Sequence, residues 1–299
     1  MIAAPINPSD LLFVEGRYRR GPQLPSRIGF EGVGLVQDHG GGLLGRRLVG
    51  KRVVVLRPQG GTWGDHCVVP ALYTIPVSSR ISDDQAAAYF VNPASALMLT
   101  RYVLPVPVGN WLMQSAAASS LGRMIIRLGK HFRFRTLNLV RKPEQVAELK
   151  ALGADEVLVV NDQTCPTEFR KQVSKICLSA LPQYAIDPVG GAIGSLMVNA
   201  LGETGRICAI AALSEDPVSV TNRTILMNRL KLFSFWLDQA LLKLSRLEQL
   251  WFFQELHRLH LAGLFQVEQF QRFPLDQWEA AIQAAGSSTG GSKILLTMK

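Results

Sequence analysis

From residue 111 onwards, short apolar runs alternate with stretches of helical periodicity. The segment 111–114 predicts a strand, 115–122 a turn of small residues, and 123–130 a helix with one apolar face. Pro143 and Gly153 are expected to begin and end a second helix. Further strands are expected at 135–140, 156–160, 184–187, 206–210 and 230–235. This alternation favours a doubly wound α/β domain with a parallel sheet of six strands and crossover helices.

The flanking parts of the chain have a different pattern. Residues 1–97 contain short β-like pieces separated by glycines, which predicts a small β-rich domain, and residues 98–235 form the α/β domain. The β-like pieces lie at 32–37, 52–56 and 65–70, and a helix follows at 83–89. Residues 236–299 begin with an amphipathic stretch at 239–261. Two strand candidates follow it at 265–273 and 293–297. We expect this last segment to rejoin the first domain.

Length and composition exclude several classes of protein. A chain of 299 residues is long enough for about two domains, so a single small binding module is excluded. Hydrophobic residues make up 47% of the chain and charged residues 18%, which excludes disordered and collagen-like proteins. Charged side chains interrupt the long apolar stretch near the C-terminus, so no segment is expected to cross a membrane.

The charge balance favours anionic ligands. Lysine and arginine total 32 against 23 aspartates and glutamates, which gives a net charge of +9. The excess contains no run of five or six basic residues, so nucleic acid is not expected as a partner. A small ligand that carries phosphate groups is the better expectation.

The cysteines and histidines predict neither disulfides nor a metal site. The four cysteines are scattered without a C-x-x-C motif, and no secretory signal precedes them, which favours a reducing compartment. That compartment would be the cytoplasm, or the mitochondrial matrix if the chain is a processed eukaryotic one. His257 and His260 lie three residues apart in a helical segment and are expected on its surface.

The turn at 115–122 is the first candidate for ligand chemistry. It reads S-A-A-A-S-S-L-G, so Gly122 alone remains of the G-x-G-x-x-G pattern of dinucleotide-binding turns. Small residues still let a pyrophosphate approach the helix N-terminus, where the binding residues would be Ala118, Ser119, Ser120 and Leu121.

Arg141 and Lys142 end the second strand of this domain, where an NAD site would carry an acidic residue. Two cations at a helix N-terminus interact unfavourably with the helix dipole, and the negative charge of a bound 2′-phosphate would offset this interaction. The pair therefore favours NADPH. The alternative is that both side chains are exposed to solvent and bind no ligand.

Several motifs together resemble a known family. They are A-P-I-N-P-S-D at 4–10, G-R-Y at 16–18, G-F-E-G-V-G at 29–34, G-T-W at 61–63, N-P-A-S-A at 92–96, L-G-A-D at 152–155, V-G-G at 189–191, F-W-L at 235–237 and S-K-I-L-L-T-M at 292–298. In these motifs, which span almost the whole chain, it resembles the zinc-independent medium-chain dehydrogenase/reductases, particularly the mitochondrial-type 2-enoyl thioester reductases, with quinone oxidoreductases close behind. The resemblance implies a GroES-like β-barrel catalytic domain, a Rossmann domain inserted in it, and NADPH bound between them.

The resemblance also implies roles for single residues. Tyr18 would be the general acid, because a phenol with an ordinary pKa of about 10 is protonated at neutral pH. The alternative is that Tyr18 is only an aromatic residue of a loop. Residues implied as cofactor contacts are Asn92, Ile210, Phe235, Trp236 and Lys293. Trp63 and Trp236 would line the substrate cleft, with burial in the core as the alternative. Lys293 would reach the cofactor phosphates unless it is an ordinary surface lysine. Asp10 and Glu31 are expected to be structural hydrogen-bond acceptors.

Two departures from the family pattern matter. Zinc-dependent relatives carry a cysteine and a histidine where this chain has Asn7 and Phe30, so neither catalytic nor structural zinc is expected. The chain also begins at the N-P-S-D strand, whereas relatives have some tens of residues before it. Either the start of the sequence is misassigned, or the first strands of the barrel are missing. In the second case the strand that leads into Asn7 would be an exposed edge with rapid hydrogen exchange.

The expected activity is NADPH-dependent reduction of the C2=C3 double bond of trans-2-enoyl thioesters of coenzyme A or acyl carrier protein. Arg17, Arg19 and Arg20 beside Tyr18 would dock an anionic carrier, or they form a solvated loop. A quinone or alkenal oxidoreductase is the first alternative, and a non-catalytic relative that binds NADPH or RNA is the second. A homodimer is expected through the strands at 206–210 and 230–235.

Overall fold

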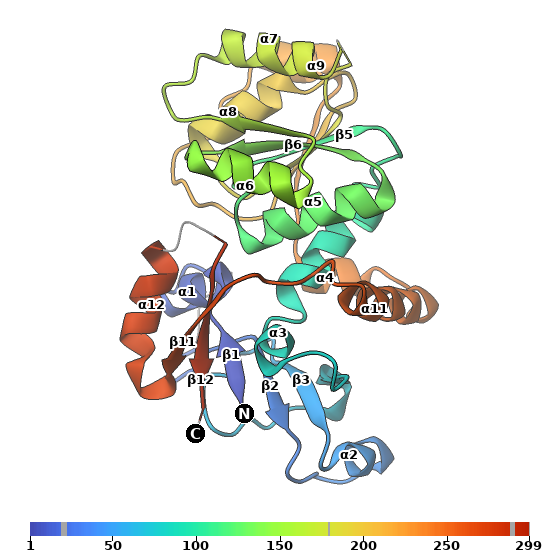
Figure 1. The fold of residues 1–299 in the computed structure, drawn as a ribbon, viewed down its shortest axis with the longest axis vertical. Coiled ribbons are helices and arrows are strands. Elements are labelled where there is room, and N and C mark those ends of the chain that lie inside the picture. Colours follow the sequence, from blue (N-terminus) through green and yellow to red (C-terminus); the bar gives the residue numbers. More distant parts are fainter. Residues whose placement is uncertain (19–22, 179, 288–290, 299) are drawn as a thin grey trace. The chain divides into compact units, whose positions relative to one another are not determined.

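A computed structural model describes the chain except for residues 19–22, 179, 288–290 and 299, and it forms two compact units (Figure 1). Unit 1 comprises Met1–Asn92 and His260–Lys299, and unit 2 comprises Pro93–Leu259. The sequence pattern placed the boundaries at 97 and 235. Unit 2 ends at Leu259 rather than at 235, because most of the chain in the two helices after the last parallel strand belongs to it.

Unit 1 contains a six-stranded sheet with the order β11-β12-β1-β2-β3-β4. Its strands are β1 (Ala3–Pro5), β2 (Glu31–Leu35), β3 (Arg52–Leu56), β4 (Thr74–Pro76), β11 (Phe270–Pro274) and β12 (Lys293–Thr297). Neighbouring strands are antiparallel, except that β11 and β12 run parallel. The C-terminal segment thus rejoins the sheet that the N-terminus begins, as the sequence pattern predicted.

The expectation of an exposed edge strand before Asn7 was wrong. β1 lies inside the sheet, paired with β12 on one side and with β2 on the other. The N–H of Ile2 donates to the Val33 carbonyl at 2.8 Å, and the N–H of Ile6 donates to the Ile294 carbonyl at 3.0 Å. β12 comes from the far end of the chain and occupies the neighbouring position, which no local pattern around residues 1–10 could reveal.

The strand expected at 65–70 is also absent from the structure, and β4 follows at Thr74–Pro76 instead. Val68 is 85% exposed, so the alternation of apolar residues in this stretch does not mark a buried face. Pro70 lacks an N–H for a ladder bond and precedes the short 3-10 helix η1 (Ala71–Tyr73). The chain therefore makes a turn before it joins the sheet.

Further helices of unit 1 connect its strands along the chain. They are α1 (Pro8–Val14), α2 (Leu43–Leu48), α3 (Asp83–Ala87), the 3-10 helix η3 (Leu275–Gln277) and α12 (Trp278–Ser287). α12 packs on β11 and β12, and Ala281 meets Ile6, Ile294 and Leu296 in a buried cluster. α4 (Val91–Met98) runs across the boundary into unit 2.

Unit 2 is a doubly wound α/β domain with the six-stranded parallel sheet that the sequence predicted. The sheet order is β10-β9-β8-β5-β6-β7. Its strands are β5 (Trp111–Gln114), β6 (Arg135–Val140), β7 (Glu156–Val159), β8 (Tyr184–Asp187), β9 (Arg206–Ala209) and β10 (Lys231–Ser234). Each strand lies within one residue of its predicted bounds.

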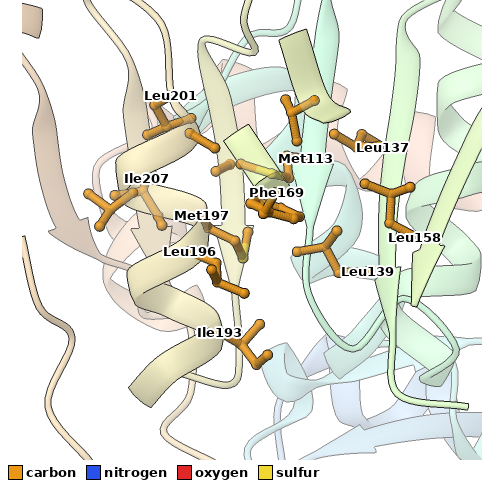
Figure 2. Close-up of a cluster of buried hydrophobic side chains, with 14 of the residues drawn as sticks. Met113, Leu137, Leu139, Leu158, Phe169, Ile193, Leu196, Met197, Leu201 and Ile207 are labelled. Atoms are coloured by element: carbon orange, nitrogen blue, oxygen red, sulfur yellow. The ribbon is translucent and has the colours of Figure 1, made fainter. Parts of the chain in front are cut away.

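Helices cover both faces of this sheet (Figure 1). They are α5 (Ser120–Phe132), α6 (Glu144–Leu152), α7 (Pro166–Ile176), α8 (Gly191–Ala200) and α9 (Asn222–Asn228), and a π-helical turn η2 (Leu99–Val103) precedes β5. Figure 2 shows the larger core cluster, in which Phe169 of α7 and Met197 of α8 pack on Met113, Leu137 and Leu139 of the strands. α5 and α6 pack on a second cluster that includes Ile126 and Leu149.

The amphipathic stretch expected at 239–261 is two helices, α10 (Leu237–Leu242) and α11 (Arg246–Leu261). Ser245 starts α11 in a capping box. Its N–H donates to Glu248 Oε2 at 2.7 Å, and its Oγ accepts from the Glu248 N–H at 3.3 Å. The S-x-x-E spacing was present in the sequence and would have marked this helix start. Among the described residues, no helix is long and apolar enough to span a membrane.

Candidate functional site

The strand order of unit 2 creates a switch point between β5 and β8. From β5 the chain proceeds to β6 and β7 on one side, and it then returns to β8, β9 and β10 on the other. The loops after β5 and β8 therefore diverge at the carboxyl edge of the sheet, where doubly wound folds bind ligands. The residues that the sequence singled out in this unit all follow strand ends at this edge.

The turn after β5 packs tightly under the start of α5. Ser119 is the N-cap, and its Oγ accepts a hydrogen bond from the Gly122 N–H at 3.1 Å. A Cβ at Gly122 would lie 2.4 Å from the Ala117 carbonyl oxygen, so only glycine fits there. Ala116 adopts a positive φ of 46°, which turns the chain into the helix. In the dinucleotide-binding pattern the third glycine allows the helix to pack closely on the strand, and Gly122 has this role here.

The helix N-terminus offers donors to an anion. Ser120 and Leu121 begin α5, so their N–H groups have no preceding helical turn to bond. The Ser119 oxygen caps the helix, and a hydroxyl that accepts one bond can still donate another. Ala118 is buried, and its carbonyl accepts from Arg123 Nε at 3.0 Å. The structure brings these four predicted residues together at one helix N-terminus, as a phosphate site requires.

Sequence reasoning missed two buried groups that support the turn. The Arg123 side chain is 4% exposed, and it pairs with Glu148 at 2.6 Å besides its bond to Ala118. Ser115 Oγ donates to Asp187 Oδ1 at 2.6 Å and so ties the end of β5 to the end of β8. Arg123 belongs to no motif, whereas Ser115 begins the turn at 115–122 that the sequence singled out, and Asp187 ends the strand beside it.

Asp187 also shapes the loop after β8. Its carboxylate accepts from the N–H of Val189 at 2.9 Å and from the N–H of Gly190 at 3.1 Å. A Cβ at Gly194 would lie 2.5 Å from Asp187 Oδ2, so α8 approaches this carboxylate closely only because that residue is glycine. Ser115, Asp187 and the V-G-G turn therefore form one hydrogen-bonded wall of the switch point.

The remaining predicted cofactor residues of unit 2 lie along the same sheet edge. Arg141 and Lys142 are exposed directly after β6, the neighbour of β5, and Arg141 forms no ion pair with any described residue. Ile210 follows β9, and Phe235 and Trp236 follow β10, where Trp236 is the N-cap of α10. The edge thus combines donors, cations and apolar side chains, which suits a phosphorylated dinucleotide with an apolar ring.

In unit 1, Tyr18 lies against Phe30. The two rings are 5.3 Å apart between centroids, and Phe13 of α1 packs edge-on against the same Phe30 ring at 5.3 Å. The Phe30 N–H donates to Asp10 Oδ1 at 3.1 Å, so a buried carboxylate fixes the backbone beneath the tyrosine. Arg17 pairs with Glu15 at 3.3 Å, and Arg19 and Arg20 lie outside the described residues.

Asp10 belongs to a buried polar cluster with Asn7, Glu31 and Lys293. Asn7 Nδ2 donates to Glu31 Oε1 at 3.0 Å, and Lys293 Nζ donates to Asn7 Oδ1. Burial raises the pKa of Asp10 to about 7, and the Lys293 charge opposes this rise. Burial likewise raises the pKa of Glu31 and lowers the pKa of Lys293. Asp10 and Glu31 are the structural acceptors that the sequence predicted.

Lys293 is buried in unit 1. The side chain is 5% exposed at the start of β12, and its ammonium binds Asn7. It is therefore not a surface lysine, whereas its predicted contact with the cofactor phosphates stays a prediction. The sequence placed it in a motif but gave no sign of the partners that enclose it.

Asn92 and Trp63 lie in unit 1 close to this cluster. Glu31 Oε2 accepts from the N–H groups of Phe90 and Val91 at 3.0 and 2.9 Å, and Asn92 follows in the first turn of α4. The Trp63 indole N–H donates to the Pro5 carbonyl at 3.3 Å, and its ring packs on the core of unit 1. This contact favours a core role for Trp63, while part of its side chain stays accessible.

Comparisons with known proteins agree with this architecture. The family described as "Alcohol dehydrogenase GroES-like domain" matches residues 1–79, and "Zinc-binding dehydrogenase" matches residues 120–251. The chain is 33% identical to the mitochondrial enoyl-[acyl-carrier-protein] reductase of Xenopus tropicalis over 80% of this chain and 68% of that protein. It is 32% identical to the Arabidopsis thaliana enzyme of the same name over 81% of this chain, a match that spans 64% of the plant protein.

Solved structures share the fold over almost the whole chain. A putative NADPH:quinone reductase from Bacillus thuringiensis has a TM-score of 0.86 and 28% identity, covering 99% of this chain and 88% of its own. A complex of Etr1p with NADP and crotonyl-CoA has a TM-score of 0.82 and 20% identity, covering 99% of this chain and 89% of its own, which is a likeness of fold alone. Unit 1 is thus a GroES-like domain and unit 2 a Rossmann domain.

The donor set does not fit the zinc that one family description implies. The positions that zinc-dependent relatives use hold the Asn7 amide and the Phe30 ring, and the Asn7 oxygen already binds an ammonium. A second cation at that oxygen would meet the Lys293 charge. Within the described residues, no three histidine, cysteine, aspartate or glutamate side chains cluster as metal ligands.

Proposed function

Because the chain belongs to the medium-chain dehydrogenase/reductase family, in the branch of the mitochondrial 2-enoyl thioester reductases, we propose that it reduces the C2=C3 double bond of trans-2-enoyl thioesters with NADPH. The observation that carries this proposal is the placement of Tyr18. Its ring packs on Phe30, whose backbone a buried carboxylate holds, so the phenol is a proton donor on a fixed support. The relatives named enoyl-[acyl-carrier-protein] reductases support the substrate class.

The carboxyl edge of the Rossmann sheet fits a phosphorylated dinucleotide. The pyrophosphate would take the N–H groups of Ser120 and Leu121, and Arg141 with Lys142 would hold the 2′-phosphate. When bound, NADPH supplies the hydride that this reduction requires. Gly122 supports this fit, since a side chain there would displace the helix N-terminus from the turn.

The chain's own contribution to the chemistry is to bind the substrate and to move a proton. Hydride addition at C3 moves the electron pair of the double bond toward C2 and the thioester oxygen, so an enolate develops. The Tyr18 phenol donates its proton to C2, and solvent returns a proton to the phenolate, which balances the reaction. A donor fixed before reaction avoids the entropy cost of bringing an acid to the enolate.

The first alternative is a quinone or alkenal reductase of the same family. Structures named putative NADPH:quinone reductases share the fold at 28% and 26% identity, and this observation keeps the alternative in view. A quinone needs a broad apolar cleft and no proton donor aimed at carbon. The role of Tyr18 therefore separates the two reactions.

The test compares NADPH oxidation with crotonyl thioesters of coenzyme A and acyl carrier protein and with a quinone. We expect thioester reduction, and Tyr18→Phe should lower kcat about a hundredfold to ten-thousandfold with the KM for NADPH nearly unchanged. Tyr73→Phe removes an exposed hydroxyl elsewhere in unit 1 and is the matched control. Wild-type protein that reduces quinones but no enoyl thioester of any length would establish the alternative. A Tyr18→Phe variant as fast as wild type would show that another group is the acid.

We also propose a homodimer that forms through β10. This strand ends the sheet of unit 2 with no neighbour beyond it in the described part of the chain, and Leu232 on it is 45% exposed. Pairing across a two-fold axis would cover that edge. Light scattering should give twice the mass of one chain, and a monomer at micromolar concentration would contradict the pairing. The names of the relatives make the mitochondrial matrix the proposed compartment if the source is eukaryotic.

A further inference from the structure

The buried cluster of unit 1 unites side chains from three distant stretches of the sequence. Asn7, Asp10, Glu31 and Lys293 are each at most 5% exposed. The Asn7 amide joins them, because its oxygen accepts from the Lys293 ammonium while its nitrogen donates to Glu31. In this orientation the Asn7 amide nitrogen donates to the Glu31 carboxylate and the Asn7 amide oxygen accepts from the Lys293 ammonium, so each buried donor meets an acceptor.

Each carboxylate of the cluster also holds a backbone segment outside it. Asp10 accepts from the N–H of Asn7 at 2.8 Å with one oxygen and from the N–H of Phe30 at 3.1 Å with the other. Glu31 accepts from the N–H groups of Phe90 and Val91, which precede Asn92. One cluster therefore fixes both the support of Tyr18 and the start of α4.

Lys293 provides the only positive charge inside this cluster. Two buried carboxylates without a cation would repel each other and lose solvation, so protonation would be favoured. A protonated carboxyl group turns one acceptor oxygen into a donor. Both oxygens of Asp10 accept from backbone N–H groups, so a proton on either would weaken the bond to Asn7 or to Phe30. A proton on Oε2 of Glu31 would weaken the bonds to the start of α4.

We propose that Lys293 is a positioning residue, whose ammonium keeps the two carboxylates as acceptors and so holds Tyr18 and Asn92 in place. The function of those two residues rests on the proposed enoyl reductase activity, whereas the coupling between Lys293 and the two backbone segments does not.

The first experiment substitutes Lys293→Met in the full chain, which keeps the length of the side chain and removes its charge. Hydrogen exchange measured by mass spectrometry should accelerate at the Phe30, Phe90 and Val91 amides, about tenfold or more if their acceptors are lost. The kcat for enoyl thioester reduction should fall about tenfold to hundredfold, because small displacements of a fixed acid are costly. The KM for NADPH should rise by less than kcat falls, because among its proposed ligands Asn92 adjoins the cluster whereas those of the phosphates lie in unit 2.

A second variant tests charge rather than shape. Lys293→Met combined with Glu31→Gln removes one charge of each sign, and the amide introduced at residue 31 can accept from the α4 amides and donate to the Asn7 oxygen after the Asn7 amide turns over. This double variant should fold even if Lys293→Met alone does not, and it should recover slow exchange and most of kcat. Lys171→Met removes an exposed lysine paired with Glu168 and is the matched control.

The outcomes separate the two proposals. Unchanged exchange at Phe30, Phe90 and Val91 in a folded Lys293→Met variant would overturn the positioning role. Failure of the double variant to recover exchange would overturn it as well, because charge balance would then not be the cause. Faster exchange in Lys293→Met that the double variant reverses would support the role even if the wild-type protein reduces no enoyl thioester, a result that would refute only the proposed activity.

Discussion

The tight contact between the turn after β5 and the start of α5 makes Gly122→Ala the sharpest test of the Rossmann turn. The new Cβ would lie 2.4 Å from the Ala117 oxygen and 2.7 Å from its carbonyl carbon, and both are backbone atoms. Ordinary contact begins near 3.4 Å, so the helix would have to withdraw by about 1 Å. A flexible side chain could yield to such a contact, but this backbone is held by the sheet.

The expected loss of stability follows from the bonds at this point. Overpacking costs about 1–3 kcal/mol. Withdrawal would also break the Ser119 cap on the Gly122 N–H and the bond from Gln114 Nε2 to the Gly122 carbonyl, each worth about 1 kcal/mol. Alanine regains about 1 kcal/mol of helix propensity. The free energy of unfolding should therefore fall by about 2–4 kcal/mol, since the propensity gain offsets one of the lost bonds.

The assay is urea denaturation followed by circular dichroism, together with NADPH titration. Gly286→Ala in α12 is the matched control, because a Cβ there meets nothing within 4 Å. That variant should be unchanged or more stable by up to about 1 kcal/mol. NADPH affinity should fall in Gly122→Ala as the donors of Ser120 and Leu121 move. Stability within about 0.5 kcal/mol of wild type would refute the packing argument.

Two further predictions concern charge. Arg141→Ala should reduce the preference for NADPH over NADH in kcat/KM by about tenfold to hundredfold, because one charge-assisted bond to the 2′-phosphate is worth about 1.5–3 kcal/mol. Equal KM values for both cofactors in wild type, unchanged in the variant, would contradict the assignment. The second prediction concerns Asp10, whose pKa is about 7 in the folded chain against an ordinary 3.8. Because the folded chain binds this proton more tightly than the unfolded chain, protonated Asp10 stabilises the fold, and that contribution is lost as the pH rises from about 4 to about 7. Urea denaturation between pH 4 and pH 7 should show that the free energy of unfolding falls less steeply with pH in Asp10→Asn than in the wild type. An unchanged dependence on pH would show that another group titrates.

The periodicity of unit 2 was sufficient to place its six strands. Parallel strands buried on both faces read as continuous apolar runs, and Leu112 and Met113 of β5 are both fully buried. Gly153 ends α6 with a φ of 108°, the conformation that its residue type predicts. Here local sequence and tertiary structure agree because each element buries its apolar face against its neighbours in the chain.

Unit 1 depends on contacts between residues far apart in sequence, and these the pattern did not show. β1 is an interior strand because β12, nearly three hundred residues later, pairs with it. The apolar alternation at 65–70 forms no strand, since no strand of the described chain pairs with it and Val68 stays in solvent.

The same difference between local pattern and long-range contact applies to the site residues. Sequence motifs identified Tyr18, Asn92, Arg141 and Lys293 as residues of interest, because residue type and spacing persist without the fold. Only the tertiary structure decided what Lys293 contacts, since the Asn7 amide that accepts from its ammonium and the two carboxylates of the same cluster arrive from the opposite end of the chain. Charge and periodicity are local properties of a sequence, whereas burial and the partner of a buried charge are properties of the folded chain.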